Sequence, residues 1–283
     1  MIYFPILGAI ALATGTMLEK AVLIRKKVNI ELYQTASFLA IIIVMVPLLY
    51  FFWRLDPQAL EPANIFVFSL IVIFSTIANL LVFYSMKWEK VTNLEPAKIL
   101  EPLFIILLAV LFSFFADGVY ERNLKVIIPA LIAGSALVFA HIEKHHLEFN
   151  NYFIAAIFGS FFFAAELVMS RLILDFYSPI SFYFLRCSAI FLISLIIFRP
   201  NFSGLNRKVS LTILLTGAVW VVYRVVVYYG YIKLGIVFTT LMIMLGPIFV
   251  YAFAHIFLKE KLSWKNITAS IIIVACILYA ILI

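Results

Sequence analysis

The chain has 283 residues, of which 66% are hydrophobic and only 12% are charged, and its mean hydropathy is +1.15. This composition excludes a water-soluble globular domain, because such a domain cannot bury so much apolar surface. The net charge of +7 does not indicate a nucleic-acid partner, because the excess cations lie between apolar stretches, where basic residues hold the cytoplasmic ends of membrane helices.

Apolar stretches of membrane-spanning length follow one another along the whole chain. A helix needs about 20 residues to cross a hydrocarbon core of about 30 Å. Unbroken runs such as 66–74 do not alternate as the strands of a membrane barrel do. We therefore expect an all-α membrane protein with ten transmembrane helices, at residues 3–22, 32–53, 64–86, 91–115, 124–141, 152–174, 179–198, 209–232, 236–258 and 264–283.

The first of these stretches is expected to remain in the protein as a helix. It runs into Glu19 and Lys20 without a small-residue cleavage site, which a signal peptide would carry. Gly8, Ala11 and Gly15 allow a neighbouring helix to approach closely. We expect Glu19 and Lys20 to take part in ion pairs at a gate or an interface between helices rather than to contact a ligand.

The fourth and ninth predicted spans are similar in sequence. Aligning LEPLFIILLAVLF from Leu100 with LGPIFVYAFAHIF from Leu245 places Pro102 over Pro247, and a short polar segment and a further apolar span follow each copy. Five spans per copy is an odd number, so two copies would enter the membrane in opposite directions and form an inverted repeat. We expect a first repeat over 1–142, a linker over 143–151 and a second repeat over 152–283.

These features resemble the drug/metabolite transporter superfamily, and within it the EamA-type proteins with two five-helix repeats. The best-matching residues are Pro247, the segment 258–266 with Glu260 in the acidic position, and Arg186 in FYFLRCSAIF. The first half departs from the pattern, with Gln34 near the place of that arginine and Asp117 in place of the glutamate.

The orientation in the membrane has two conflicting indications. Lys and Arg concentrate in the odd-numbered connections, such as 25–27 and 207–208, which places those connections in the cytoplasm and both termini outside. The family resemblance implies that both termini are inside. Both orientations therefore stay open.

Several ionisable residues fall inside predicted spans, where a charge at mid-bilayer costs at least about 2.5 to 3.5 kcal/mol. Such residues are expected to face protein or a wet cavity. Lys98 and Glu101 lie three residues apart in the fourth span, so they can neutralise each other locally. Together with Asn79 in the third span and Glu166 in the sixth, they are candidates for the lining of a substrate site.

The eighth span carries the most informative pattern. Trp220, Tyr223, Arg224 and Tyr228 follow the i, i+3, i+4, i+8 spacing of one helix face. We expect this face to bind substrate. The alternative is that Arg224 pairs with an acidic residue of the fourth or sixth span and only fixes packing, while the tyrosines form an interfacial belt.

Proline interrupts the two similar spans at matching places. Interrupted helices at corresponding places in two repeats indicate the binding site of a transporter. Pro102, Gly246 and Pro247 are therefore predicted hinge residues. The alternative is a simple kink that aids packing.

The function that fits these features is secondary transport by alternating access across the inner (plasma) membrane. The expected solute is a small amphipathic metabolite such as an amino acid, with its carboxylate toward Arg224 and its ammonium toward Glu101; a drug-like lipophilic cation is the second choice. Glu101 and Glu166 are candidates for proton coupling, which would make protons a partner beside the solute and the bilayer.

Two other classes of protein were weighed. An integral-membrane enzyme acting on lipid or isoprenoid substrates would need polar groups gathered around His141, His145 and His146 or around His255. A pore or structural subunit would show flux without saturation. Because the sequence contains no HExxH or GxSxG pattern, we expect no catalytic residue, no metal and no cofactor.

Overall fold

The computed structural model of the protein describes residues 4–89, 91–116, 118–141, 150–249 and 264–282. Within these ranges the secondary structure is helical, and the only extended pairing is an isolated bridge between Leu55 and Tyr177. The helices are α1 (Phe4–Leu23), α2 (Ile30–Phe52), η1 (Pro57–Leu60), α3 (Pro62–Trp88), α4 (Val91–Lys98), α5 (Leu100–Ser113), α6 (Leu124–His141), α7 (Asn151–Ile173), η2 (Leu174–Phe176), α8 (Pro179–Phe198), η3 (Phe202–Gly204), α9 (Arg207–Lys233), α10 (Ile236–Ile243) and α12 (Trp264–Leu282).

Seven helical segments of the described residues are long and apolar enough to cross a membrane. Three shorter apolar helices, Leu124–Ala140, Ile236–Phe249 and Ile267–Leu282, lie within the fifth, ninth and tenth predicted spans. Large apolar side chains such as Tyr50 and Phe115 stand more than four-fifths exposed on the outside of the bundle. The prediction of a multi-pass, all-α membrane protein is therefore confirmed, whereas the count of ten crossings stays a prediction.

Polar caps set the starts of four helices. Asn29, Asn150, Ser178 and Asn206 each accept a hydrogen bond from the backbone N–H three residues later, at the beginnings of α2, α7, α8 and α9. A cap of this kind satisfies one of the amides that a helix start leaves without a partner. Each start lies within two residues of the predicted one.

The fourth predicted span is not one continuous helix, and neither is the described part of the ninth. Ile99 separates α4 from α5, and a turn at Met244 and Leu245 separates α10 from a helical stretch over 246–249. Pro102 and Pro247 fall in the first turn of the piece after each break. Proline fits there because that amide has no helical partner in any case. Both spans are thus interrupted next to the prolines that the sequence singled out, and the role of these residues as hinges stays a prediction. Residues after Phe249 in the second span lie outside the described ranges.

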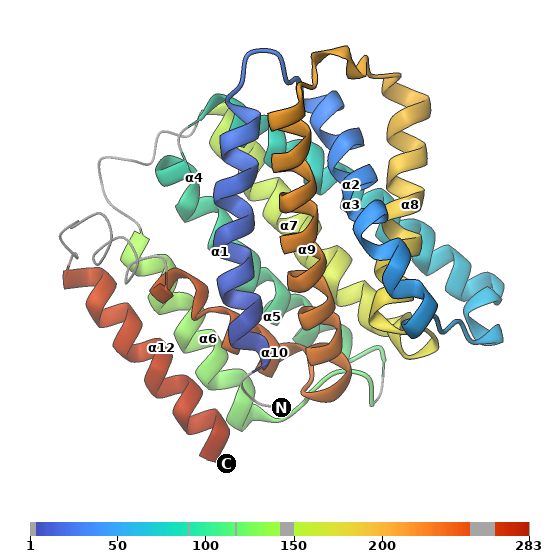
Figure 1. Ribbon diagram of the computed structural model, residues 1–283. Coiled ribbons are helices and arrows are strands. Elements are labelled where there is room, and N and C mark those ends of the chain that lie inside the picture. The colour runs from blue at the N-terminus through green and yellow to red at the C-terminus, as the bar shows by residue number, and fades with distance from the viewer. Residues whose placement is uncertain (1–3, 90, 117, 142–149, 250–263, 283) are drawn as a thin grey trace.

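The principal helix pairs join the two halves of the chain. α3 packs along α7, α1 along α9, α2 along α8, and α6 along α12. Figure 1 shows α1 and α9 side by side in the middle of the bundle, with α6 and α12 on one flank and α2 and α8 on the other. Neither half therefore forms a separate bundle.

Small residues allow the close approach of α1 to α9. A Cβ atom on Gly8 would lie 2.9 Å from Val226 Cγ1, and one on Gly15 would lie 3.1 Å from the indole ring of Trp220. The expectation of a close helix contact at these glycines is met. As a result, the Trp220 ring lies directly against the backbone of α1.

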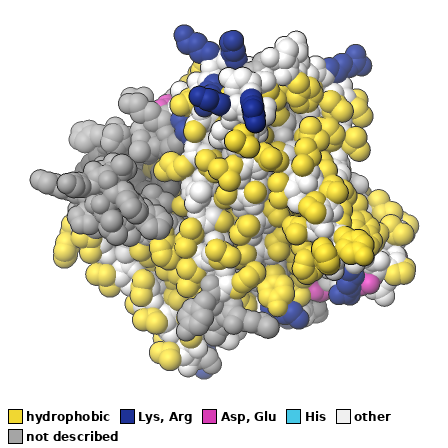
Figure 2. All heavy atoms as spheres, in the orientation of Figure 1, with side chains coloured by type: hydrophobic (Ala, Val, Ile, Leu, Met, Phe, Trp, Pro, Cys, Tyr) yellow, Lys and Arg dark blue, Asp and Glu magenta, His cyan; other side chains and the backbone are white. Residues whose placement is uncertain are grey.

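Basic side chains gather at one end of the molecule. Figure 2 shows them at the end where Figure 1 places the α1–α2 and α8–α9 connections. Exposed residues there include Arg25, Lys26, Arg207 and Lys208. Both termini of the described chain lie toward the opposite end (Figure 1). The sequence predicts this distribution of basic residues. The charge rule places this end of the molecule in the cytoplasm, whereas the family resemblance places the end with the termini there.

A contact between distant segments fixes the start of α10. Glu121, in the connection before α6, accepts hydrogen bonds from the amides of Val237 at 3.0 Å and Phe238 at 3.4 Å. Burial raises the pKa of the Glu121 carboxyl, and these amide hydrogen bonds oppose the rise. Gly235 makes the contact possible, because its φ of +86° is open to glycine and a Cβ atom would lie 1.8 Å from Glu121 Oε1.

We predict that Gly235→Ala destabilises the protein more than Gly118→Ala. Gly118 also has a positive φ, of +77°, but no atom lies within 4 Å of its missing Cβ. Both changes cost about 1 to 2 kcal/mol of backbone strain, and Gly235→Ala also displaces the Glu121 cap, which adds about 0.5 to 2 kcal/mol. Thermal unfolding of the detergent-solubilised protein measures the difference, and equal losses of Tm would contradict it.

Candidate functional site

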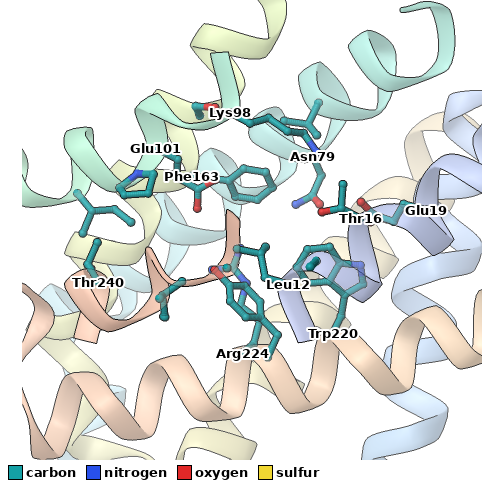
Figure 3. Close-up of a pocket in the computed structure, with 18 of the residues that line it drawn as sticks. Leu12, Thr16, Glu19, Asn79, Lys98, Glu101, Phe163, Trp220, Arg224 and Thr240 are labelled. Atoms are coloured by element: carbon teal, nitrogen blue, oxygen red, sulfur yellow. The ribbon is translucent and has the colours of Figure 1, made fainter. Parts of the chain in front are cut away.

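A cavity of about 190 Å³ lies inside the bundle, and residues of every α-helix from α1 to α10 border it. A space of this size holds on the order of ten water molecules. Its walls are mainly apolar, and they also carry five ionisable side chains, namely Glu19, Lys98, Glu101, Arg186 and Arg224. Figure 3 shows several of these side chains pointing inward.

Most of the predicted site residues border this cavity. They are Asn79, Lys98, Glu101, Trp220, Tyr223 and Arg224, together with the predicted hinge residues Pro102, Gly246 and Pro247. Glu166 and Tyr228 are not part of the lining. They lie behind Arg224, in a buried cluster that joins α7, α8 and α9.

Glu166 interacts with two arginines. Arg186 Nη1 donates to Glu166 Oε1, the Tyr228 hydroxyl donates to the same oxygen at 3.1 Å, and Arg186 Nη1 also donates to the Tyr228 hydroxyl at 2.5 Å. Arg224 Nη1 stands 3.5 Å from Glu166 Oε2. Glu166 is fully buried. Its single negative charge is shared by two guanidinium groups in apolar surroundings.

Arg224 is held loosely on the side that faces the cavity. Its guanidinium carbon lies 5.4 Å from the ring centre of Phe163 and 5.6 Å from that of Tyr223, distances at which a cation is attracted to an aromatic face. Nη1, the nitrogen that stands 3.5 Å from Glu166 Oε2, is buried and forms no hydrogen bond among the described residues. Arg224 therefore contributes to packing through Glu166 and also borders the cavity.

Lys98 and Glu101 do not neutralise each other. Figure 3 shows Lys98 extending toward Asn79, whereas the carboxylate of Glu101 points toward the side where Arg224 lies. The helix is interrupted at Ile99, so Lys98 ends α4 and Glu101 lies in the first turn of α5. Within the described part of the chain, neither forms an ion pair within 4.0 Å.

Two charged lining residues, Glu19 and Arg186, were not predicted to be substrate-site residues. Glu19 is the one that points to a further helix face. It is 6% exposed and borders the cavity, on the same side of α1 as Leu12 and Thr16. The i, i+4, i+7 spacing of Leu12, Thr16 and Glu19 could have suggested this face. The neighbouring Lys20 obscured the pattern, because two adjacent opposite charges resemble an ion pair.

Lys20 instead takes part in a contact between the ends of α1 and α3. Its ammonium donates to the carbonyls of Met86 and Glu89, the latter at 2.6 Å. In return, Lys87 of α3 donates to the carbonyls of Leu23 and Val28. Each lysine thus satisfies carbonyls that the end of the other helix leaves open.

The histidines considered for an enzyme give no site that can be assessed. His145, His146 and His255 lie outside the described residues, as do Asp117 and Glu260. Among the residues that the structure describes, no group of His, Cys, Asp and Glu is arranged to hold a metal ion.

Residues 150–282 match the model of the EamA-like transporter family. This half of the chain is an EamA domain. The resemblance to the drug/metabolite transporter superfamily, to which the family belongs, is therefore confirmed. The EamA domain contributes Glu166, Arg186 and Arg224, whereas Glu19, Lys98 and Glu101 come from the preceding half.

The fold is also found in a solved structure described only as "Crystal structure of protein". The two chains superpose with a TM-score of 0.70 over 99% of this chain and 97% of the other, at 16% sequence identity. At this identity the likeness concerns the fold alone, and it includes the half that precedes the EamA domain. No curated protein matches the chain.

We predict that Glu166→Gln strongly destabilises the EamA domain. Removing one partner of a buried ion pair leaves uncompensated charge and costs about 3 to 5 kcal/mol. Arg171→Gln, on the same helix, is the matched control: its i, i+4 pair with Asp175 is partly exposed, at 2.6 Å, and is worth about 0.5 kcal/mol. Thermal unfolding of both variants is the measurement, and a Tm of Glu166→Gln equal to that of the control would contradict the prediction.

Proposed function

We propose that the protein is a secondary transporter that moves a small amphipathic metabolite, such as an amino acid, across the plasma membrane by alternating access. The observation that carries this proposal is the meeting of the Arg224 guanidinium with Glu19 and Glu101, two carboxylates that form no ion pair among the described residues, in one largely apolar cavity of a chain with an EamA domain. Small-molecule sites commonly combine apolar walls with a few polar groups that fix orientation.

The arrangement of helices supports two inverted repeats, over 1–142 and 152–283. In this arrangement α1, α2, α3 and α6 of the first half correspond to α7, α8, α9 and α12 of the second. Exchanging the halves then turns the α3–α7 pair into the α9–α1 pair, and it leaves the α2–α8 and α6–α12 pairs unchanged. The breaks before Pro102 and Pro247 also correspond. Repeats related in this way rock around a central site in many carriers, and the breaks supply hinge positions for that movement.

The cavity favours a solute that carries both charges. A carboxylate at the part of the Arg224 guanidinium that borders the cavity would form a strong, charge-assisted hydrogen bond. An ammonium group would bind Glu101, which borders the cavity and forms no ion pair within 4.0 Å among the described residues. Phe163 and Trp220 offer aromatic surface to the apolar part of the solute.

Geometry favours Glu101 over Glu166 as the carboxylate that exchanges protons. A coupling carboxylate has to reach the cavity in order to take up and release its proton. Glu101 borders the cavity, whereas Glu166 lies behind Arg224 and already bonds to Arg186 and Tyr228. We therefore place the coupling proton, if one is used, on Glu101.

We predict that Arg224→Ala lowers amino-acid transport in proteoliposomes at least tenfold at subsaturating solute. The loss follows from one hydrogen bond between charged groups, worth about 1.5 to 3 kcal/mol. Uptake of labelled leucine into vesicles of the wild type, Arg224→Ala and Arg171→Gln is the measurement. Arg171→Gln should retain uptake, and unchanged uptake by Arg224→Ala would remove Arg224 from the site.

We predict that Glu101→Gln abolishes the response of uptake to an imposed pH gradient. A glutamine keeps the size and polarity of the side chain but carries no titratable proton. Exchange of labelled for unlabelled solute at equal pH should persist, which separates loss of coupling from loss of binding. Uptake that follows the pH gradient equally in the wild type and in Glu101→Gln would contradict the assignment.

A further inference from the structure

The cavity has polar groups at two separate ends. At one end Glu101 and Thr240 face Arg224, and at the other end Glu19, Lys98, Asn79 and Thr16 point toward one another (Figure 3). The apolar side chains of Leu12 and Phe163 lie between the ends. The proposed function employs only the end with Arg224 and Glu101, so the other polar end has no assigned role.

The groups at this second end are not satisfied by the protein. Within the described residues Glu19 forms no ion pair within 4.0 Å, and the single contact of the Lys98 ammonium is Met86 Sδ at 3.2 Å, a weak acceptor. The Tyr33 hydroxyl and the Trp220 Nε1 act on the Glu19 carboxylate, but neither forms a hydrogen bond of ordinary length and angle with a described residue. Buried polar groups without partners are costly, which favours a ligand group at this place.

The second end offers acceptors on one side and a donor on the other. The Asn79 amide nitrogen donates to the Ser75 carbonyl at 2.7 Å, which leaves the Asn79 oxygen as the free acceptor of that side chain. Glu19 adds carboxylate oxygens, and Lys98 supplies N–H donors. Lys98 is the strongest charged neighbour of Glu19, so the two charges act on the same small volume.

We propose that Glu19, Lys98 and Asn79 form a second polar subsite that binds a neutral group with both donors and an acceptor, such as a carboxamide, at the far end of an amino-acid solute. This inference rests on the proposed function, because the head of the solute is placed at Arg224 and Glu101. The carboxamide NH₂ donates to Glu19 and Asn79, and its oxygen accepts from the Lys98 ammonium.

Other tails fit this subsite less well. An ammonium tail meets Lys98 and a carboxylate tail meets Glu19, so each approaches a like charge. An apolar tail leaves all three protein groups without partners. A site built to hydrogen-bond a substrate group discriminates strongly against the analogue that lacks it, because the protein's buried polar atoms then stay unpaired. The structure thus favours glutamine over methionine, whose side chain has similar length and no amide.

Binding of four amino acids to the wild-type protein tests the subsite. The full chain is placed in lipid nanodiscs, and the affinities for L-glutamine, L-methionine, L-glutamate and L-lysine are measured by titration calorimetry. We expect glutamine to bind at least tenfold more tightly than each of the other three. Equal affinities for glutamine and methionine, or tightest binding of glutamate or lysine, would overturn the subsite and leave the transport proposal intact. Binding of none of the four would overturn both the amino-acid assignment and the subsite.

A charge-neutral double variant assigns the preference to these residues. Glu19→Gln combined with Lys98→Met removes both charges together, so no lone buried charge remains. We expect the glutamine-to-methionine affinity ratio to fall to about one. Lys20→Met is the matched control, since Lys20 is adjacent to Glu19 but bonds to the end of α3, and it should keep the wild-type ratio. If the double variant keeps the wild-type affinity ratio, other residues cause the preference for glutamine and the subsite is wrong. If the double variant does not fold, the wild-type titrations alone decide whether the subsite exists.

Discussion

Glu166 provides the interaction on which the cavity depends. This one carboxylate interacts with three side chains from two helices, namely Arg186 of α8 and Arg224 and Tyr228 of α9. These contacts explain how a carboxylate can be buried there without a water molecule or a lipid headgroup. The pairing fixes α7, α8 and α9 relative to one another at mid-depth. Because one carboxylate is divided between two guanidiniums, Arg224 keeps binding capacity for another anionic group.

The second constraint is the division of the proline-containing spans into separate helical pieces. Had 91–115 formed one helix, Lys98 and Glu101 would lie on one face and could pair with each other. In the structure the helix is interrupted at Ile99, Lys98 extends toward Asn79, and the Glu101 carboxylate points toward the side where Arg224 lies. In the corresponding span of the second half, Glu121 from the first half accepts hydrogen bonds from amides in the first turn of the short α10 helix, which have no helical partner.

The features set by local sequence were predictable, and those set by distant contacts were not. Hydropathy located the spans, the prolines located the breaks, and helical periodicity placed Trp220, Tyr223 and Arg224 on the cavity. The same periodicity included Tyr228, but the approach of Arg186 from α8 turns that face into a buried contact. Glu19 and Lys20 were assigned to ion pairs at a gate or helix interface, because nothing in α1 shows that Lys20 alone reaches α3 while Glu19 borders the cavity. The Glu121–Val237 contact joins residues too far apart in the chain for any sequence pattern to reveal.

The reciprocal lysine bonds between α1 and α3 limit how these two helices can move. Axial sliding by one residue, about 1.5 Å, would stretch the bonds of Lys20 and Lys87 at the same time. Tilting about this end leaves both sets almost unchanged. The junction can therefore serve as a pivot but not as a sliding joint, and α1 and α3 should swing together while their opposite ends separate.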